Sequence, residues 1–309
     1  MKTLEGQSIL VTGGSGSFGN AFVRKVLALS PKRVIVYSRG EQLQETMSQT
    51  ISDHRVRYFI GDVRDRERLE IAMHGVDVVV HAAAMKIVHI AEYNPYECIQ
   101  TNITGAENIC RAAIASGVTR VVGLSTDKAV NPLNLYGATK LAAEKIFVAA
   151  NNMAAGRCDF SVCRYGNVLG SRGSVVPFFR SIIADGKGVF PITDPRMTRF
   201  WMTLDQAVEL VISSLGMMHG REIFIPKLPS VRIVDLAKAM EPSYALDIVG
   251  IRPGEKLHEV LLTEDEARLS MEAYDRYIVN GGPSNVVDQF RYSSDNNKIL
   301  TVDEIRKYL

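Results

Sequence analysis

The chain of 309 residues has 46% hydrophobic residues, four cysteines and a formal net charge of +2. This length predicts one large domain or two unequal domains. The charge is nearly balanced, and no run of Lys and Arg is dense enough to indicate a nucleic-acid or membrane-surface footprint. The segment MKTLEGQSILVTGG has too short an apolar run for a signal peptide, and no stretch approaches the roughly 18 apolar residues of a membrane span. We expect a cytoplasmic protein without a metal site, whose reduced, buried cysteines are Cys98, Cys110, Cys158 and Cys163.

Short apolar runs alternate with helix-length segments from residue 8 to about residue 164. Runs of this kind are typical of parallel strands that are covered on both faces. The runs are SILVTG, RVIVYS, RVRYFIGD, DVVVHAAA, RVVGLS and DFSVCRYG. They predict an α/β fold with a doubly wound parallel sheet of the Rossmann type.

The rhythm changes after Gly166 to shorter, proline-rich pieces such as GSVVPFF and VFPITDPRMTRFWMT. We therefore predict a dinucleotide-binding domain over residues 1–166. Residues 167–309 are expected to form mainly a smaller, C-terminal substrate-binding domain, with some segments returning to the first domain.

The segment VTGGSGSFGN, residues 11–20, stands where the first strand should pass into the first helix. Its glycines fit two overlapping spacings that allow a tight turn and a close approach of the backbone to a pyrophosphate at a helix N-terminus. Because the segment follows a strand and opens a βαβ unit, it predicts a dinucleotide site. The expected contacts in this loop are Gly13, Ser15, Gly16, Ser17, Phe18 and Gly19.

The end of the second strand distinguishes NADP from NAD. An NAD site usually has an acidic residue there for the ribose hydroxyls, whereas VIVYSRGE has Ser38 and Arg39, which suit the 2′-phosphate of NADP. The alternative is that Arg39 is a solvated loop residue and that Glu41 binds the ribose.

Two further strand ends extend the expected cofactor site. GDVRD places Asp62 and Val63 where the adenine would lie, and HAAAMK brings small residues to the middle of the cofactor. His81 is expected to be a hydrogen-bonded residue at a strand end rather than a ligand. The remaining expected contacts are Ala82, Ala83 and Lys86, although Lys86 also fits a surface position.

The stretch STDKAVNPLNLYGATK, residues 125–140, follows the predicted fifth strand. Tyr136 and Lys140 are four residues apart and therefore share one face of a helix. A nearby ammonium group and a bound nicotinamide both favour tyrosinate, so we expect a lowered pKa for Tyr136. Tyr136 would then accept a hydroxyl proton while a hydride passes to the nicotinamide.

Taken together, the motifs resemble those of the extended short-chain dehydrogenases/reductases. Within that superfamily they are similar to the inverting UDP-N-acetylglucosamine 4,6-dehydratases that open the pseudaminic acid pathway. The similarity covers nearly the whole chain, through TGGSGSFG, YSRGE, GDVRD, HAAAMK, AEYNPYE, STDKAVNPLNLYGATK, RYGNVLGSRGSVVP, ITDPRMTRFWMT and GIRPGEKLHE. Gly40 departs from the pattern, because an acidic residue is common at its place in YSRGE, and this weakens the second-strand loop as a cofactor clamp.

The resemblance implies NADP-dependent 4,6-dehydration of UDP-N-acetylglucosamine with inversion at C5, carried out by a homo-oligomer. The product would be a UDP-4-keto-6-deoxy-L-arabino-hexosamine for surface-glycan or flagellin-glycan synthesis. In related dehydratases a Thr-Asp-Glu triplet follows the fifth strand, and Thr126, Asp127 and Lys128 stand in its place. The resemblance therefore implies that Lys128 removes the C5 proton and that Asp127 protonates the departing C6 hydroxyl.

These two roles require a lysine pKa that is lowered and an aspartic acid pKa that is raised. A direct ion pair between Asp127 and Lys128 would oppose both shifts. Because adjacent residues of an extended segment point to opposite sides, we expect burial and the nicotinamide charge to dominate instead.

Proline- and glycine-rich segments of the second half supply polar groups for the nucleotide sugar, where arginine forks can bind a diphosphate. In the resembling family, RPGEK recurs at the UDP site. The expected substrate contacts are Lys86, Asn167, Arg172, Thr193, Arg199, Arg252 and Glu255, and Val168 is expected beside the cofactor.

Other functions compete with this one. A C4 epimerase or a simple ketoreductase would use Tyr136 and Lys140 and leave Asp127 and Lys128 solvated, and a retaining dehydratase would differ only in the final protonation. A catalytically silent NADP-binding scaffold would use none of these residues. The acid–base pair favours dehydration, because sugar-nucleotide epimerases lack it.

Overall fold

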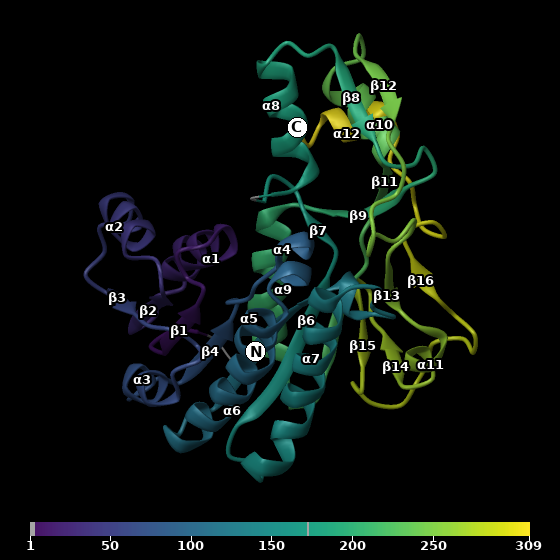
Figure 1. The fold of residues 1–309 in the computed structure, drawn as a ribbon. Helices are drawn as coiled ribbons and strands as arrows, with labels where there is room; N and C mark the ends of the chain where they lie inside the picture. Colours follow the sequence, from purple (N-terminus) through teal and green to yellow (C-terminus); the bar gives the residue numbers. More distant parts are fainter. Residues whose placement is uncertain (1–3, 172) are drawn as a thin grey trace.

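A nine-stranded sheet forms the centre of the molecule, in the order β14-β15-β10-β6-β5-β4-β1-β2-β3. The structure, a computed structural model, describes residues 4–171 and 173–309 (Figure 1). Strands from β3 to β10 pair in parallel, and β15 and β14 add two antiparallel strands at the edge. The strands are β1 Ser8–Thr12, β2 Arg33–Ser38, β3 Val56–Ile60, β4 Val78–His81, β5 Arg120–Thr126, β6 Asp159–Tyr165, β10 Ile223–Pro226, β14 Ser270–Glu272 and β15 Arg276–Val279.

The six apolar runs of the sequence form six adjacent strands of this sheet. All residues of β1 and β4 are buried, because helices cover the sheet on both faces. The strand order reverses between β1 and β4, which is the point where open α/β sheets form a ligand-binding crevice at the carboxyl ends of the strands. The predicted α/β fold with a doubly wound parallel sheet is confirmed.

Helices in two layers connect the parallel strands. α1 packs against α9, while α6 packs against both α3 and α7 in a second layer. These helices and their neighbours are α1 Ser17–Leu27, α2 Glu41–Thr50, α3 Arg66–Ala72, α4 Val88–Tyr93, α5 Pro95–Ile99, the π-helical turn η1 Gln100–Thr104, α6 Gly105–Ala115, the 3₁₀ turn η2 Asp127–Ala129, α7 Leu135–Ala154 and α9 Leu204–Met217.

A smaller unit follows β6 and has an apolar core of its own, which includes Phe179, Phe190 and Leu236. Figure 1 shows α8, α10 and α12 gathered with β8 and β12 at the upper end of the view, away from the main sheet. Its elements are β7 Asn167–Val168, α8 Val175–Ala184, β8 Val189–Ile192, β9 Thr198–Met202, β11 Ser230–Arg232, α10 Ile233–Met240, β12 Ala245–Ile248 and α12 Val302–Arg306. The remaining elements are the antiparallel strand pair β13 Val260–Leu262 and β16 Tyr292–Ser293, and the short helix α11 Glu264–Ala267.

The four cysteines are buried and unpaired, as the sequence predicted. Burial raises the pKa of the Cys158 thiol to about 12, so this thiol stays protonated at neutral pH. No helix within the described ranges is both long enough and apolar enough to cross a membrane.

Candidate functional site

One cavity of about 1590 Å³ opens at the carboxyl ends of the parallel strands. It exceeds the range of roughly 300–1,000 Å³ that is usual for one small ligand, and residues of both the main sheet and the smaller unit line it. The predicted site residues that line it are Gly13, Ser15, Gly16, Ser17, Phe18, Gly19, Ser38, Arg39, Asp62, Val63, Ala82, Ala83, Lys86, Thr126, Lys128, Tyr136, Lys140, Asn167, Val168, Thr193, Arg199, Arg252 and Glu255. Asp127 lies just beneath the lining and is fully buried, and Arg172 falls outside the described residues.

The glycine-rich loop forms a cradle at the N-terminus of α1. Gly13 has a left-handed backbone with φ of +64°, and a Cβ atom there would come within 2.9 Å of the backbone nitrogen of Ala83. The Gly16 N–H donates to the Gly13 carbonyl at 2.9 Å, and Gly16 precedes the helix without a capping side chain. The first amides of α1 are therefore available to a pyrophosphate, which fits the expected dinucleotide.

The hydroxyl of Ser38 at the end of β2 is held within a polar group of side chains. Its Oγ lies 2.8 Å from the Ser15 Oγ, and the buried Gln44 donates to the Ser38 Oγ at 2.9 Å. The sequence interpretation missed Gln44, although a glutamine on the helix after the second strand was a visible signal. Arg39 is 58% exposed, and its Nη1 lies 3.7 Å from the Asp62 carboxylate.

His81 at the end of β4 is buried, and its Nδ1 lies 2.8 Å from the Thr12 Oγ1. Burial, reinforced by the nearby Lys140, lowers the pKa of His81 to about 3. The imidazole is therefore neutral at neutral pH, and the prediction of a hydrogen-bonded residue at a strand end is confirmed.

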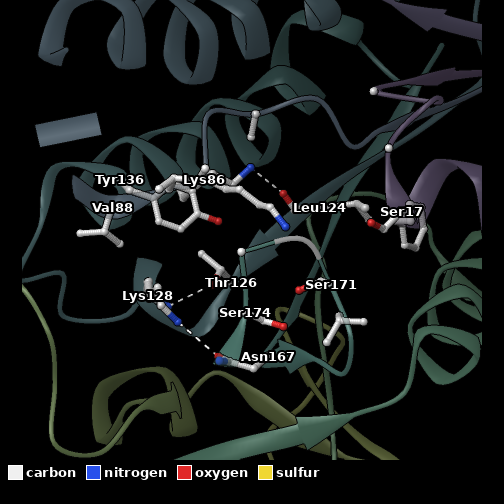
Figure 2. A pocket seen from close by; sticks show the side chains of 18 of the residues that line it. Ser17, Lys86, Val88, Leu124, Thr126, Lys128, Tyr136, Asn167, Ser171 and Ser174 are labelled. Carbon is white, nitrogen blue, oxygen red and sulfur yellow. Dashed lines mark hydrogen bonds between the residues drawn. The ribbon is translucent and has the colours of Figure 1, made fainter. Parts of the chain in front are cut away.

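The start of α7 brings Tyr136 close to the turn that carries Lys128. Asn134 caps the helix by accepting the Gly137 N–H at 2.8 Å. A Cβ atom on Gly137 would collide with the Lys128 carbonyl oxygen, so glycine is needed for this close approach. In Figure 2, Thr126 lies between Tyr136 and Lys128, and Asn167 lies on the far side of Lys128.

The expected lowering of the Tyr136 pKa is wrong for the protein alone. Burial raises the pKa of Tyr136 to about 12, and the ammonium of Lys128 and a hydrogen bond with Thr126 offset this only in part. Lys140 donates to the Leu124 carbonyl at 2.6 Å, and its burial lowers its own pKa to about 8. The charge that acts on Tyr136 thus comes from Lys128 rather than from Lys140.

The expected separation of Asp127 and Lys128 is also wrong. The two residues lie in the 3₁₀ turn η2 rather than in an extended segment, so the Lys128 side chain turns back and places Nζ 3.0 Å from the Asp127 Oδ1. Although burial alone would lower it, the pKa of Lys128 is raised, because Asp127 and Glu259 stabilise the ammonium. Burial raises the pKa of Asp127 against the opposing effect of Lys128, and its Oδ2 has no hydrogen-bond partner among the described residues.

Glu259 and Lys256 are site residues that the sequence interpretation missed. Glu259 is 2% exposed and lies 3.4 Å from the Lys128 Nζ, and Lys256 lies 3.7 Å from the other carboxylate oxygen of Glu259. Both residues belong to GIRPGEKLHE. The available signal was an acidic residue directly before the apolar run VLL, where burial would require a cationic partner.

The arginines expected to bind the diphosphate differ in their surroundings. Arg252 is 63% exposed, with Nη1 3.8 Å from the Glu255 Oε1. Arg199 is buried, and its guanidinium donates to the carbonyls of Thr198 at 2.7 Å and Lys256 at 2.9 Å. Arg252 is therefore free to turn towards a ligand, whereas Arg199 braces the segment that carries Glu259.

The chain is similar to known proteins both in sequence and in structure. Residues 9–281 match the family described as polysaccharide biosynthesis protein. The UDP-N-acetylglucosamine 4,6-dehydratase (inverting) of Campylobacter jejuni subsp. jejuni serotype O:23/36 (strain 81-176) is 52% identical, over 94% of this chain and 93% of the relative. The UDP-glucose 4-epimerase of Rickettsia conorii (strain ATCC VR-613 / Malish 7) is 39% identical, over 98% of this chain and 95% of the relative. The X-ray structure of Pen from Bacillus thuringiensis is 37% identical and superposes with a TM-score of 0.92, covering 99% of this chain and 97% of that one.

Proposed function

The chain belongs to the family of polysaccharide biosynthesis proteins, and from that membership we propose that it is a hydro-lyase acting on UDP-N-acetylglucosamine. It removes water across C5 and C6 and inverts C5, giving a UDP-4-keto-6-deoxy-L-arabino-hexosamine. The 52% identity to the Campylobacter jejuni relative supports this reaction. The observation that carries the proposal is the Asp127–Lys128 pair beside Tyr136, because a C4 epimerase needs no second acid and base.

Tyr136 has the role of base towards the C4 hydroxyl. The cradle at Gly13 and the α1 N-terminus fit a dinucleotide, and a bound NADP supplies the chemistry of taking a hydride from C4 and returning it to C6. The Lys128 ammonium stabilises the tyrosinate form of Tyr136. Oxidation of C4 to a ketone acidifies the proton on C5. The first task of the residues is thus to accept one hydroxyl proton at the phenol oxygen.

The Asp127–Lys128 pair then supplies an acid and a base together. Moving one proton from Lys128 Nζ to Asp127 Oδ1, across their 3.0 Å hydrogen bond, converts an ammonium and a carboxylate into an amine and a carboxylic acid. Burial lowers the free energy of this neutral form relative to the ion pair, because desolvation penalises both charges, whereas Glu259 stabilises the resting ammonium. The amine takes the C5 proton, the acid protonates the departing C6 hydroxyl, and the pair returns to its starting form as water leaves. The final proton to C5 comes from Lys128 or Tyr136.

We propose NADP as the cofactor, with Ser38, Arg39 and the N-terminus of α2 around the 2′-phosphate. Gly40 precedes α2 without a capping side chain, and the Asp62 carboxylate near Arg39 is already bound by Arg64 at 2.7 Å. Arg39→Ala should reduce the preference for NADP over NAD in binding titrations. Arg66→Ala, at an exposed arginine of α3, serves as the control, and an unchanged preference in Arg39→Ala would contradict the NADP assignment.

The two parts of the fold have different proposed binding roles. We propose that residues 1–166 bind the dinucleotide and that residues 167–309 mainly bind the nucleotide sugar. The strands β10, β14 and β15 return from the second part to the main sheet. The product then enters the synthesis of a surface-glycan or flagellin-glycan sugar.

The test is to incubate the purified protein with UDP-N-acetylglucosamine in deuterated water and to analyse the product by mass spectrometry and NMR. We expect loss of one water, an arabino product with deuterium at C5, and no net consumption of NADPH. A xylo product formed from the outset would indicate a retaining dehydratase, and an isomer of unchanged composition would indicate an epimerase. An unchanged substrate would favour a silent scaffold.

A further inference from the structure

The Lys128 ammonium lies between two buried carboxylates that come from distant parts of the chain. Asp127 is its neighbour in sequence, whereas Glu259 directly precedes β13. The Nζ atom lies 3.0 Å from Asp127 and 3.4 Å from Glu259, and it donates to the Asn167 Oδ1 at 3.3 Å. The mechanism above assigns a role to Asp127 but none to Glu259.

The backbone of Glu259 is fixed by the C-terminal part of the chain. Its N–H donates to the Ser294 Oγ at 2.9 Å, and the Ser294 N–H donates back to the Glu259 carbonyl at 2.8 Å. The Ser294 hydroxyl also lies 2.7 Å from the Thr198 Oγ1 on β9. Three segments therefore fix the point from which the Glu259 side chain reaches Lys128.

Two further cations surround the Glu259 carboxylate. The Arg199 Nε lies 3.8 Å from Oε1, and the Lys256 Nζ lies 3.7 Å from Oε2. Burial alone would raise the pKa of Glu259, but Lys128, Arg199 and Lys256 outweigh it and lower this pKa. Glu259 is therefore an anion at neutral pH.

We propose that Glu259 is a positioning residue that holds the Lys128 amine beside Asp127 and towards the reacting sugar. Without Glu259, the flexible lysine side chain would have Asp127 and Asn167 as its remaining polar anchors among the described residues. A fixed Nζ keeps the proton transfer within the Asp127–Lys128 pair at one place in the cavity. This inference rests on the proposed dehydration, and it adds a residue to the site from outside the STDKAVNPLNLYGATK motif.

The charges that face Lys128 determine what a substitution does. Asp127 and Glu259 raise its pKa, the cations Arg199 and Lys256 oppose them, and Tyr136 on α7 is the nearby titratable phenol. Glu259→Gln keeps the shape and removes one negative charge, so the pKa of Lys128 must fall. The carboxamide oxygen can still accept a hydrogen bond, but it attracts the ammonium less strongly.

The first experiment follows the pH dependence of kcat for dehydration. In Glu259→Gln, the limb of the kcat–pH profile that follows the ionisation of Lys128 should move to lower pH by about one unit or more. We expect kcat to fall about tenfold because the Lys128 Nζ is less well placed for proton transfer. KM should change less than about threefold, because the 2% exposed Glu259 carboxylate is occupied by Lys128, Arg199 and Lys256. Glu259→Asp keeps the charge and should return the limb towards its wild-type position.

Glu222→Gln is the matched control, because Glu222 is also buried but bonds Ser161 and backbone amides away from the cavity. Thermal melting of each variant separates loss of fold from loss of positioning. If Glu259→Gln does not fold, Glu259→Asp decides, since its shorter side chain should lower kcat without moving the limb. A wild-type kcat in that variant would overturn the proposal.

The second experiment needs no substrate and therefore separates this inference from the proposed function. In protein labelled with [ε-¹³C]lysine, the Lys128 signal is assigned by its loss in Lys128→Met and is then titrated by NMR. In Glu259→Gln its midpoint should lie about one pH unit or more below that of the wild type. Superimposable titrations would overturn the inference even if dehydration is observed, as would an equal shift in Glu222→Gln. A lower midpoint in a protein that does not dehydrate the substrate would support the Glu259–Lys128 coupling and reject the function.

Discussion

Lys128 illustrates how neighbouring charge can outweigh burial at a single residue. Removal from water lowers a lysine pKa, but two carboxylates within 3.4 Å reverse the direction. Asp127 behaves differently, because burial dominates and raises its pKa. In the resting protein the aspartate is thus suited to become an acid, while the lysine must pass on a proton before it can act as a base.

Replacement of Lys128 by alanine should stop proton abstraction at C5. We expect kcat to fall by about 10² to 10⁴, the usual contribution of a general base, with little change in UDP affinity. Dehydration rates and UDP titrations measure the two effects. Lys187→Ala removes an exposed lysine that pairs with Asp185 and should change neither. Normal dehydration by Lys128→Ala would assign Lys128 to a purely structural role.

Replacement of Arg252 by alanine should weaken the binding of UDP and of UDP-N-acetylglucosamine by a similar factor, because a guanidinium on the diphosphate does not sense the sugar. Isothermal titration measures both affinities. Arg268→Ala is a close control, since Arg268 is 60% exposed and lies 3.7 Å from Asp265, three residues earlier. An unchanged affinity for UDP would remove Arg252 from the site.

His81 should make the stability of the protein fall in acid. Its folded pKa of about 3 lies below the ordinary value of 6.5, so the unfolded chain binds a proton that the folded protein excludes. The contribution of His81 is complete above about pH 6.5 and is lost as pH falls towards 3, at up to about 1.4 kcal/mol per pH unit. Urea unfolding at pH 7, 6 and 5 should show a smaller loss for His81→Gln than for wild type. His54→Gln, at an exposed imidazole, should lose stability as wild type does.

At the level of elements, the regular parts of the fold could be predicted because their signals are local. The apolar runs report strands buried on both faces, and Gly13 and Gly19 report a turn in which side chains would clash with backbone. The turn η2 could not be predicted, since no glycine or proline occurs within Asp127–Ala129 to indicate that the chain bends after β5. This missed turn is why the Asp127–Lys128 pairing was expected to be absent.

Asn134 links the start of α7 to the loop that carries Arg252. Its Oδ1 accepts the Gly137 N–H at the start of α7, and its Nδ2 donates to the Gly254 carbonyl at 2.8 Å. Asn134→Ala should therefore destabilise the protein by about 0.5–2 kcal/mol, as expected for loss of an N-cap. It should also raise KM for the UDP-sugar, because the Arg252 loop loses its anchor.

Denaturant unfolding and steady-state kinetics measure these two effects of Asn134→Ala. Thr301→Ala removes the cap of α12 at the far end of the smaller unit, and it should lower stability without raising KM. An equal rise of KM in both variants would show that Asn134 has no specific role in anchoring the loop.

At the level of the whole molecule, the site depends on contacts between residues that are distant in sequence. Local motifs predicted Tyr136, Asp127 and Lys128, since all three lie within one short stretch. The partnership of Lys128 with Glu259 could not be predicted, because it depends on how β13 packs beside η2. Nor could sequence show that Arg199 is occupied by backbone carbonyls rather than free to bind a diphosphate.

The late position of β10 has a consequence for synthesis on the ribosome. β6 is complete at Tyr165, but its parallel partner β10 begins only at Ile223, and β15 covers β10 only after Arg276. At roughly 5–20 residues per second, the nascent chain displays an unpaired apolar sheet edge for several seconds. An edge of this kind invites pairing between neighbouring chains. Translation that stalls between β6 and β10 should therefore yield aggregates, and chaperone demand should be highest during that interval.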